Sequence, residues 1–97
     1  MSPPKITLLY FASLRTSLPD EPTSQIIQLP SSPSPFNLYD LRIHLVKDLH
    51  RGNEEFERAL EKSSWSVDEE MIEIENEKEF HLREGQVVCG IPPVSGG

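Results

Sequence analysis

Cysteine is nearly absent from this sequence, which has a single one, Cys89, among its 97 residues. One thiol cannot close a disulfide within the chain, so there is no reason to expect an oxidising compartment. Its neighbours Val87, Val88 and Ile91 are apolar, and unpaired cysteines commonly behave as small hydrophobic residues. We therefore expect Cys89 to be a core residue.

Long hydrophobic runs are also missing. No apolar stretch approaches the roughly 18–20 residues that span a bilayer. The first residues lack the basic segment and apolar stretch that are typical of a signal peptide. We therefore expect a cytosolic protein that has no membrane partner.

Basic residues are scarce relative to acidic ones. The chain has 9 lysines and arginines against 16 aspartates and glutamates, a formal net charge of −7. Nucleic acids and anionic membranes both select basic surfaces, so we exclude a nucleic-acid partner. An acidic surface suits a partner with a basic docking surface, or it serves solubility alone. We interpret His44 and His50 as surface residues and expect no metal site.

The residues that are present are enough for one small domain. A length of 97 residues leaves no room for two domains. Hydrophobic residues make up 36% of the chain and charged residues 26%, as in soluble globular proteins. The proline- and serine-rich residues 30–35 are interpreted as a loop, because nothing of domain size lies on either side.

Apolar runs and alternating patterns predict five strands. We expect them at residues 5–12, 24–29, 63–68, 71–75 and 86–91. The first strand has apolar side chains on both faces, which is typical of a central strand. A hairpin is the natural connection between the first two strands, and Glu84 and Gly85 predict a turn before the last.

Leucines at helical spacing predict a main helix over residues 38–50. Asn37 is a suitable N-cap for it, with Asp40 at the third position beyond. Asn53 is a suitable cap for a second, shorter helix over residues 54–62, whose first turn is acidic.

The order of these elements favours an α+β fold with a mixed sheet of about five strands. The most apolar strands, the first and the last, are best placed side by side and parallel in its middle, with the main helix across one face. This is the β-grasp arrangement of ubiquitin-like proteins. We expect residues 1–91 to form this domain and residues 92–97 to form an extended tail.

The chain ends in IPPVSGG. Proline fixes φ and donates no hydrogen bond, so Pro92 and Pro93 should end the sheet and keep the chain extended. Glycine has no Cβ, so the backbone at Gly96 and Gly97 can enter a narrow channel. Residues 92–97 would reach roughly 20 Å when extended. We interpret them as an arm that presents the terminal carboxylate, with a plain flexible end as the alternative.

A terminal carboxylate becomes reactive only when one of its oxygens is converted into a leaving group. Attack on a nucleotide phosphate gives an acyl adenylate, from which a sulfur or amine nucleophile can take the acyl group. A diglycine end would let an adenylating enzyme close tightly around it.

IPPVSGG resembles the terminal motif of the small subunit of molybdopterin synthase, a family of sulfur carriers. LLYFASLR at residues 8–15 is similar to the opening strand of that family, and REGQVVCGIPPVSGG is similar to its closing turn and strand. The middle is less similar: the loop at residues 30–36 is long, and Ser66-Val67-Asp68-Glu69 stands where the family often has Ala-Val-Asn-Gln.

The resemblance implies a sulfur carrier of molybdenum-cofactor biosynthesis. An enzyme of the ubiquitin-activating type would consume ATP and adenylate Gly97, and a sulfurtransferase would convert the end to a thiocarboxylate. The tail would then enter the large synthase subunit and donate sulfur to cyclic pyranopterin monophosphate (precursor Z). Two small and two large subunits would form a heterotetramer. The acid–base chemistry would belong to the large subunit, and this chain would hold no permanent cofactor.

The resemblance also implies a set of partner-binding residues. Phe11, Met71 and Ile91 match family positions of an apolar docking patch, and Arg15 matches an arginine that follows the first strand. Core packing is the alternative for the three apolar residues, and a plain surface charge is the alternative for Arg15. The delivery arm itself would comprise Pro92, Pro93, Val94, Ser95, Gly96 and Gly97.

Three other functions remain open from the sequence. A sulfur carrier of the thiamin pathway also ends in Gly-Gly, but the two prolines favour molybdopterin synthase. A ubiquitin-like modifier would be joined through Gly97 to lysines of target proteins and would give a ladder of conjugates. In a plain interaction module, the tail would only bind, and removal of Gly97 would abolish no chemical activity.

Overall fold

The structure is a computed structural model, and it describes residues 4–32 and 34–93. Within these residues the chain forms five strands, three α-helices, a π-helical segment and a 3₁₀ helix. Their bounds are β1 Lys5–Tyr10, α1 Ala12–Thr16, β2 Ser24–Gln28, α2 Leu38–His44, η1 Leu45–Leu49, α3 Glu54–Glu61, β3 Ser64–Val67, β4 Glu70–Ile72, η2 Ile74–Glu79 and β5 Val87–Ile91. None of the helices described is long and apolar enough to cross a bilayer.

The five strands form one mixed sheet in the order β2-β1-β5-β3-β4. The first and last strands, β1 and β5, are parallel neighbours, and the other pairs are antiparallel. Leu8 of β1 lies opposite Val88 of β5, and both side chains are buried. The predicted α+β fold, with its apolar first and last strands together inside the sheet, is confirmed.

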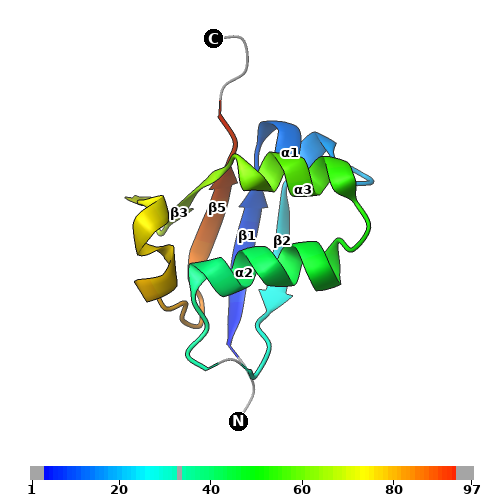
Figure 1. Ribbon diagram of the computed structural model, residues 1–97. Helices are drawn as coiled ribbons and strands as arrows, with labels where there is room; N and C mark the ends of the chain where they lie inside the picture. The colour runs from blue at the N-terminus through cyan, green and yellow to red at the C-terminus, as the bar shows by residue number, and fades with distance from the viewer. Residues whose placement is uncertain (1–3, 33, 94–97) are drawn as a thin grey trace.

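The core lies between the sheet and the helices, which cover one face of the sheet (Figure 1). Alternate residues of β1 point into it, because successive side chains of a strand face opposite sides. The α2–η1 segment adds leucines on one side, and α3 adds Phe56 and Leu60. The largest fully buried side chain is Trp65 of β3.

Two asparagine caps fix where the helices begin. The Asn37 side chain accepts a hydrogen bond from the Asp40 backbone N–H, and the Asp40 carboxylate accepts one from the Asn37 N–H. The Asn53 side chain accepts a hydrogen bond from the Phe56 N–H at the start of α3. Both predicted caps are confirmed, since each satisfies donors that the first helical turn would otherwise leave unpaired.

The main helix is not one regular helix over residues 38–50, as the leucine spacing predicts. It becomes π-helical over Leu45–Leu49, and the His50 N–H donates to the Leu45 carbonyl, five residues back, at 2.8 Å. The wider turn shifts the phase of the helix by about one residue. Leu49 is therefore exposed, while His50 turns inward and is half-buried. The interpretation of His50 as a surface residue is wrong for this reason.

The first predicted strand is too long by two residues. It ends at Tyr10, and the connection to the second strand, expected to be a hairpin, contains the short helix α1. Leu14 and Leu18, four residues apart, are both buried against the core, and this packing explains the helical turn.

The strand expected at residues 71–75 is too long as well, because β4 ends at Ile72 and a 3₁₀ helix, η2, follows. This turn places Glu77 in the interior, where it pairs with Arg42 of α2 at 2.7 Å. The other predicted strands agree with β2, β3 and β5 to within two residues at each end.

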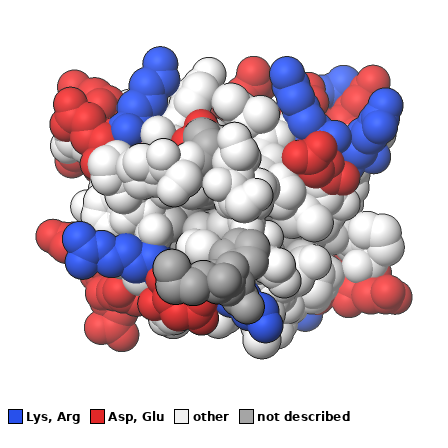
Figure 2. Space-filling model, turned by 90° about the horizontal axis from the view of Figure 1, so that it is seen from below, with Lys and Arg blue, Asp and Glu red and all other residues white. Residues whose placement is uncertain are grey.

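The start of β1 and the end of β5 lie at opposite ends of the domain (Figure 1), as parallel neighbouring strands require. Viewed from the end where β1 begins, both acidic and basic side chains lie around the margin, and much of the described surface between them is uncharged (Figure 2). The described surface at this end therefore carries charges of both signs. The end of β5, from which the tail begins, lies at the other end of the domain.

Candidate functional site: an open sheet face and a tail root

One face of the sheet, which we call the open face, is the side opposite to α2 and α3. Leu9, Cys89, Ser66 and Met71 lie in register across four strands, β1, β5, β3 and β4. Residues next to them along the strands, such as Leu8, Val88 and Trp65, are buried in the core, so these four residues face away from it.

The open face is rich in exposed apolar side chains. Met71 is 58% exposed and Phe11 is 46% exposed. Ile26 of the edge strand β2 and Val87 at the start of β5 are also exposed, and by strand alternation they lie on this face. Exposed apolar side chains gathered on one face can mark a site of protein–protein interaction.

The structure brings Phe11 and Ile91 together near the ends of β1 and β5. Phe11 continues β1 in extended backbone, with φ −122° and ψ 151°, and Tyr10 pairs with Gly90. The next residues, Phe11 and Ile91, are therefore neighbours on the open face. Met71 lies on the same face but farther along the sheet, on the edge strand β4. Their role in docking stays a prediction.

Arg15 lies in α1, close to the end of β1. Its Nε donates to the Glu21 carbonyl oxygen at 3.0 Å. This hydrogen bond holds the loop between α1 and β2 against the helix. Whether Arg15 also contacts a partner stays a prediction.

The prediction that Cys89 belongs to the core is wrong. Its side chain lies on the open face between Leu9 and Ser66 and is half-buried. Burial, with a smaller contribution from the negative charge of Glu69, raises the pKa of the Cys89 thiol. The thiol is therefore protonated near neutral pH, which argues against a role as nucleophile.

The tail root is the place where β5 leaves the sheet. Pro92 is buried and Pro93 is exposed, so the chain is anchored one residue beyond the strand. Gly90 lies directly beneath α1: a Cβ there would stand 2.7 Å from Leu14 Cδ1. The absence of a side chain at Gly90 therefore lets α1 pack over the end of β5.

The predictions for Val94, Ser95, Gly96 and Gly97 fall outside the described residues and stay predictions.

Buried polar contacts hold β1 next to η1 behind this root. The Tyr10 hydroxyl donates to Gln25 Oε1 at 2.6 Å, so its oxygen is left to accept from His50 Nε2 at 3.1 Å. Burial raises the pKa of Tyr10 and lowers the pKa of His50. The cluster is therefore uncharged near neutral pH and acts as a link between elements.

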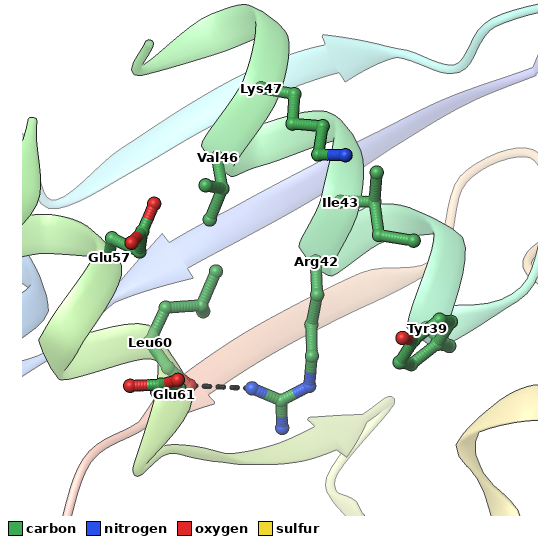
Figure 3. Close-up of a pocket in the computed structure, with 8 residues that line it drawn as sticks. All are labelled: Tyr39, Arg42, Ile43, Val46, Lys47, Glu57, Leu60 and Glu61. Atoms are coloured by element: carbon green, nitrogen blue, oxygen red, sulfur yellow. Dashed lines mark hydrogen bonds between the residues drawn. The ribbon is translucent and has the colours of Figure 1, made fainter. Parts of the chain in front are cut away.

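A shallow pocket of about 220 Å³ lies between α2 and α3 (Figure 3). Its floor is apolar, from Val46 and Leu60, and Arg42 crosses it to donate to the Leu60 carbonyl oxygen. Charges of both signs surround it. Within residues 4–32 and 34–93, no three His, Cys, Asp or Glu side chains converge as metal ligands.

No family model matches the chain. The molybdopterin synthase sulfur carrier subunit of Mycosarcoma maydis is 39% identical to it over 94 residues, which cover 97% of this chain and 95% of the relative.

Two solved structures are similar in fold. One is a complex of subunits 1 and 2 of the molybdopterin-converting factor of Helicobacter pylori, with a TM-score of 0.60 and 18% identity over 96% of this chain and 99% of that chain. The other is named as subunit 1 of a molybdopterin converting factor from Pyrococcus furiosus, with a TM-score of 0.68 and 21% identity over 94% and 99%.

The fold and the site together define a β-grasp protein of the ubiquitin-like class, with an open apolar sheet face beside the root of its C-terminal tail. Within that class, the near full-length relative shows that the chain belongs to the family of molybdopterin synthase sulfur carrier subunits.

Proposed function

We propose that this chain carries sulfur for a molybdopterin synthase in molybdenum-cofactor biosynthesis. The observation that supports this most directly is the 39% identity to a sulfur carrier subunit across almost the whole length of both chains. Such a role requires a terminal Gly-Gly, and this sequence has one after Pro92 and Pro93. We expect the reaction to take place in the cytosol.

The reacting group in this proposal is the carboxylate of Gly97. One of its oxygens attacks the α-phosphorus of ATP in an activating enzyme, and pyrophosphate leaves. A persulfide sulfur of a sulfurtransferase then attacks the acyl carbon and displaces AMP. A second thiol cleaves the sulfur–sulfur bond of the resulting acyl disulfide, which releases the thiocarboxylate and leaves a disulfide on the sulfurtransferase. ATP is consumed by the activating enzyme, and this chain holds no resident cofactor.

The partner that accepts the sulfur would be the large synthase subunit. The related Helicobacter pylori structure is a complex of subunits 1 and 2, which supports a two-subunit assembly here. In this proposal Phe11, Ile91 and Met71 dock on the large subunit while the tail enters its active site. There the thiocarboxylate sulfur would bond to a carbon of the cyclic pyranopterin precursor in place of an oxygen substituent. Water would then cleave the bond between this sulfur and the Gly97 carbonyl carbon, which leaves the sulfur on the precursor and restores the carboxylate. A heterotetramer of two small and two large subunits is the expected assembly.

Removal of Gly96 and Gly97 tests the proposal. The last residue of β5 is Ile91, so the shortened chain should melt at the temperature of the full chain. It should produce no molybdopterin when mixed with the large subunit, the activating enzyme, ATP and a sulfur donor. Full activity of the shortened chain would refute the role of the terminus.

A further inference from the structure

A groove of about 380 Å³ lies at the tail root. We call it the tail groove. α1 and the C-terminal end of α3 flank the point where β5 ends (Figure 1), and they supply its walls. Its lining residues are Ser13, Arg58, Ala59, Lys62, Pro92 and Pro93.

The charge of this groove differs from the charge of the whole chain. Among its described lining residues are two cations, Arg58 and Lys62, and no carboxylate, although the chain carries a net charge of −7. The pocket between α2 and α3 mixes carboxylates with cations instead. The tail groove is therefore a local basic site on an acidic protein.

The two cations are placed together by the helix. Arg58 and Lys62 are four residues apart at the C-terminal end of α3, so they project from the same side. Lys62 also suits the negative end of the helix dipole. Arg58 lies 3.7 Å from Glu54, but both side chains are more than 75% exposed, so this pair restrains the guanidinium weakly.

The distance to the chain terminus limits what these cations can touch. Four residues follow Pro93, and the last of them, Gly97, carries the terminal carboxylate. In an extended chain these four residues would span roughly 13 Å. When the tail enters a channel in extended form, Arg58 and Lys62 stay outside, at its mouth. They are then too far away to contact the phosphates of ATP or of a pterin held at the end of the tail.

We propose that the tail groove binds an acidic segment, with aspartate or glutamate side chains, on the large synthase subunit at the mouth of the channel that receives the tail. This inference rests on the proposed function. Arginine presents a planar fork that matches a carboxylate, and lysine adds a second positive charge beside it. Complementary charges at the edge of an interface mainly raise the rate of association.

The test compares two pairs of charge reversals in the full chain. Arg58→Glu/Lys62→Glu changes the tail groove. Lys47→Glu/Arg51→Glu makes the same change in net charge at exposed residues that do not line it. The rate of association with the purified large subunit is measured by stopped flow at low and high salt. We expect the groove variant to bind at least about tenfold more slowly at low salt, and the control less than about threefold.

Equal slowing by both pairs would show an effect of net charge alone and would overturn the inference, as would an unchanged rate. Thermal melts check the fold of each variant. Should the charge reversals unfold the chain, Arg58→Gln/Lys62→Gln replaces them, with an expected slowing of about threefold and a weaker dependence on salt.

A separate readout keeps this inference distinct from the proposed function. Thiocarboxylate formation on the unmodified chain, together with equal rates for all variants, would refute the tail groove and leave the sulfur carrier intact. Absence of any thiocarboxylate would refute the carrier itself. Slower loading by the activating enzyme, with unchanged binding to the large subunit, would show that the groove binds the activating enzyme instead of the large subunit. This result would overturn the inference.

Discussion

At the scale of single residues, Arg42 connects more elements than any other side chain described above. Its Nε and Nη2 donate to the two carboxylate oxygens of Glu77 at 2.7 and 2.9 Å. It also donates to the carbonyl oxygens of Leu60 and Ser63, and its guanidinium lies 5.1 Å from the ring centroid of Trp65. One side chain thus joins α2 to η2, to the end of α3 and to β3.

We predict that Glu77→Ala lowers the free energy of unfolding by about 3 kcal/mol, because Arg42 would be left with an uncompensated charge in a largely buried place. Urea denaturation measures the change. Glu54→Ala is the matched control, since Glu54 forms an exposed pair with Arg58, and it should cost less than about 1 kcal/mol. A Glu77→Ala variant as stable as the control would contradict this account of the ion pair.

At the scale of elements, local signals in the sequence were sufficient for some features and insufficient for others. Asn37 and Asn53 predict the starts of two helices correctly, because a cap depends on residues three positions apart. The π-helical turn at Leu45–Leu49 could not be predicted, because it depends on the contact of His50 with Tyr10, forty residues away. The pairing of Glu77 with Arg42 could not be predicted for the same reason, because the two residues lie far apart in the sequence.

The candidate functional site, too, could be predicted from the sequence only in part. Alternation along the predicted first strand puts Phe11 on the face opposite to Leu8 and Tyr10, and in the structure Phe11 is exposed while Leu8 and Tyr10 are buried. The prediction that Cys89 lies in the core is wrong, because apolar neighbours indicate a buried strand but do not indicate which of its two faces is covered. The tail groove needs α1, α3 and β5 together, so no single stretch of sequence could reveal it.

The packing of α1 on β5 gives a prediction at this scale. Gly90→Ala would place a Cβ 2.7 Å from Leu14 Cδ1, and overpacking of this kind costs about 1–3 kcal/mol. The cost should shrink in a Leu14→Ala background, where the clash is removed. Unfolding free energies of the two single variants and the double variant form the cycle. Additivity within about 0.5 kcal/mol would contradict a direct clash.

At the scale of the whole molecule, helices cover one face of the sheet and leave the other face open (Figure 1). The apolar open face and the tail root meet where β1 and β5 end, near Phe11 and Ile91. A protein that docks on this face is thereby placed next to the emerging tail. In the proposed function, the fold would therefore couple docking to delivery of the terminus.

We predict that Phe11→Asp weakens binding to the large subunit by at least about tenfold, because a charge would be buried at the centre of an apolar contact. Isothermal titration calorimetry measures the dissociation constant, and a thermal melt confirms folding. Ile74→Asp is the control. Ile74 is 71% exposed, but it lines a pocket with Tyr39 and Arg42 of α2 and so lies away from the open face. This variant should bind like the unmodified chain. An unchanged dissociation constant for the folded Phe11→Asp variant would count against the docking face.

The central claim is that the terminal carboxylate of Gly97 is the group that carries sulfur. Intact-mass spectrometry of the full chain, after incubation with its activating enzyme, ATP and a sulfur donor, tests this most directly. The account predicts a mass increase equal to the replacement of one oxygen by sulfur, located at Gly97 by fragmentation and absent without ATP. An unchanged mass with an active enzyme, or a chain joined to lysines of other proteins, would contradict it.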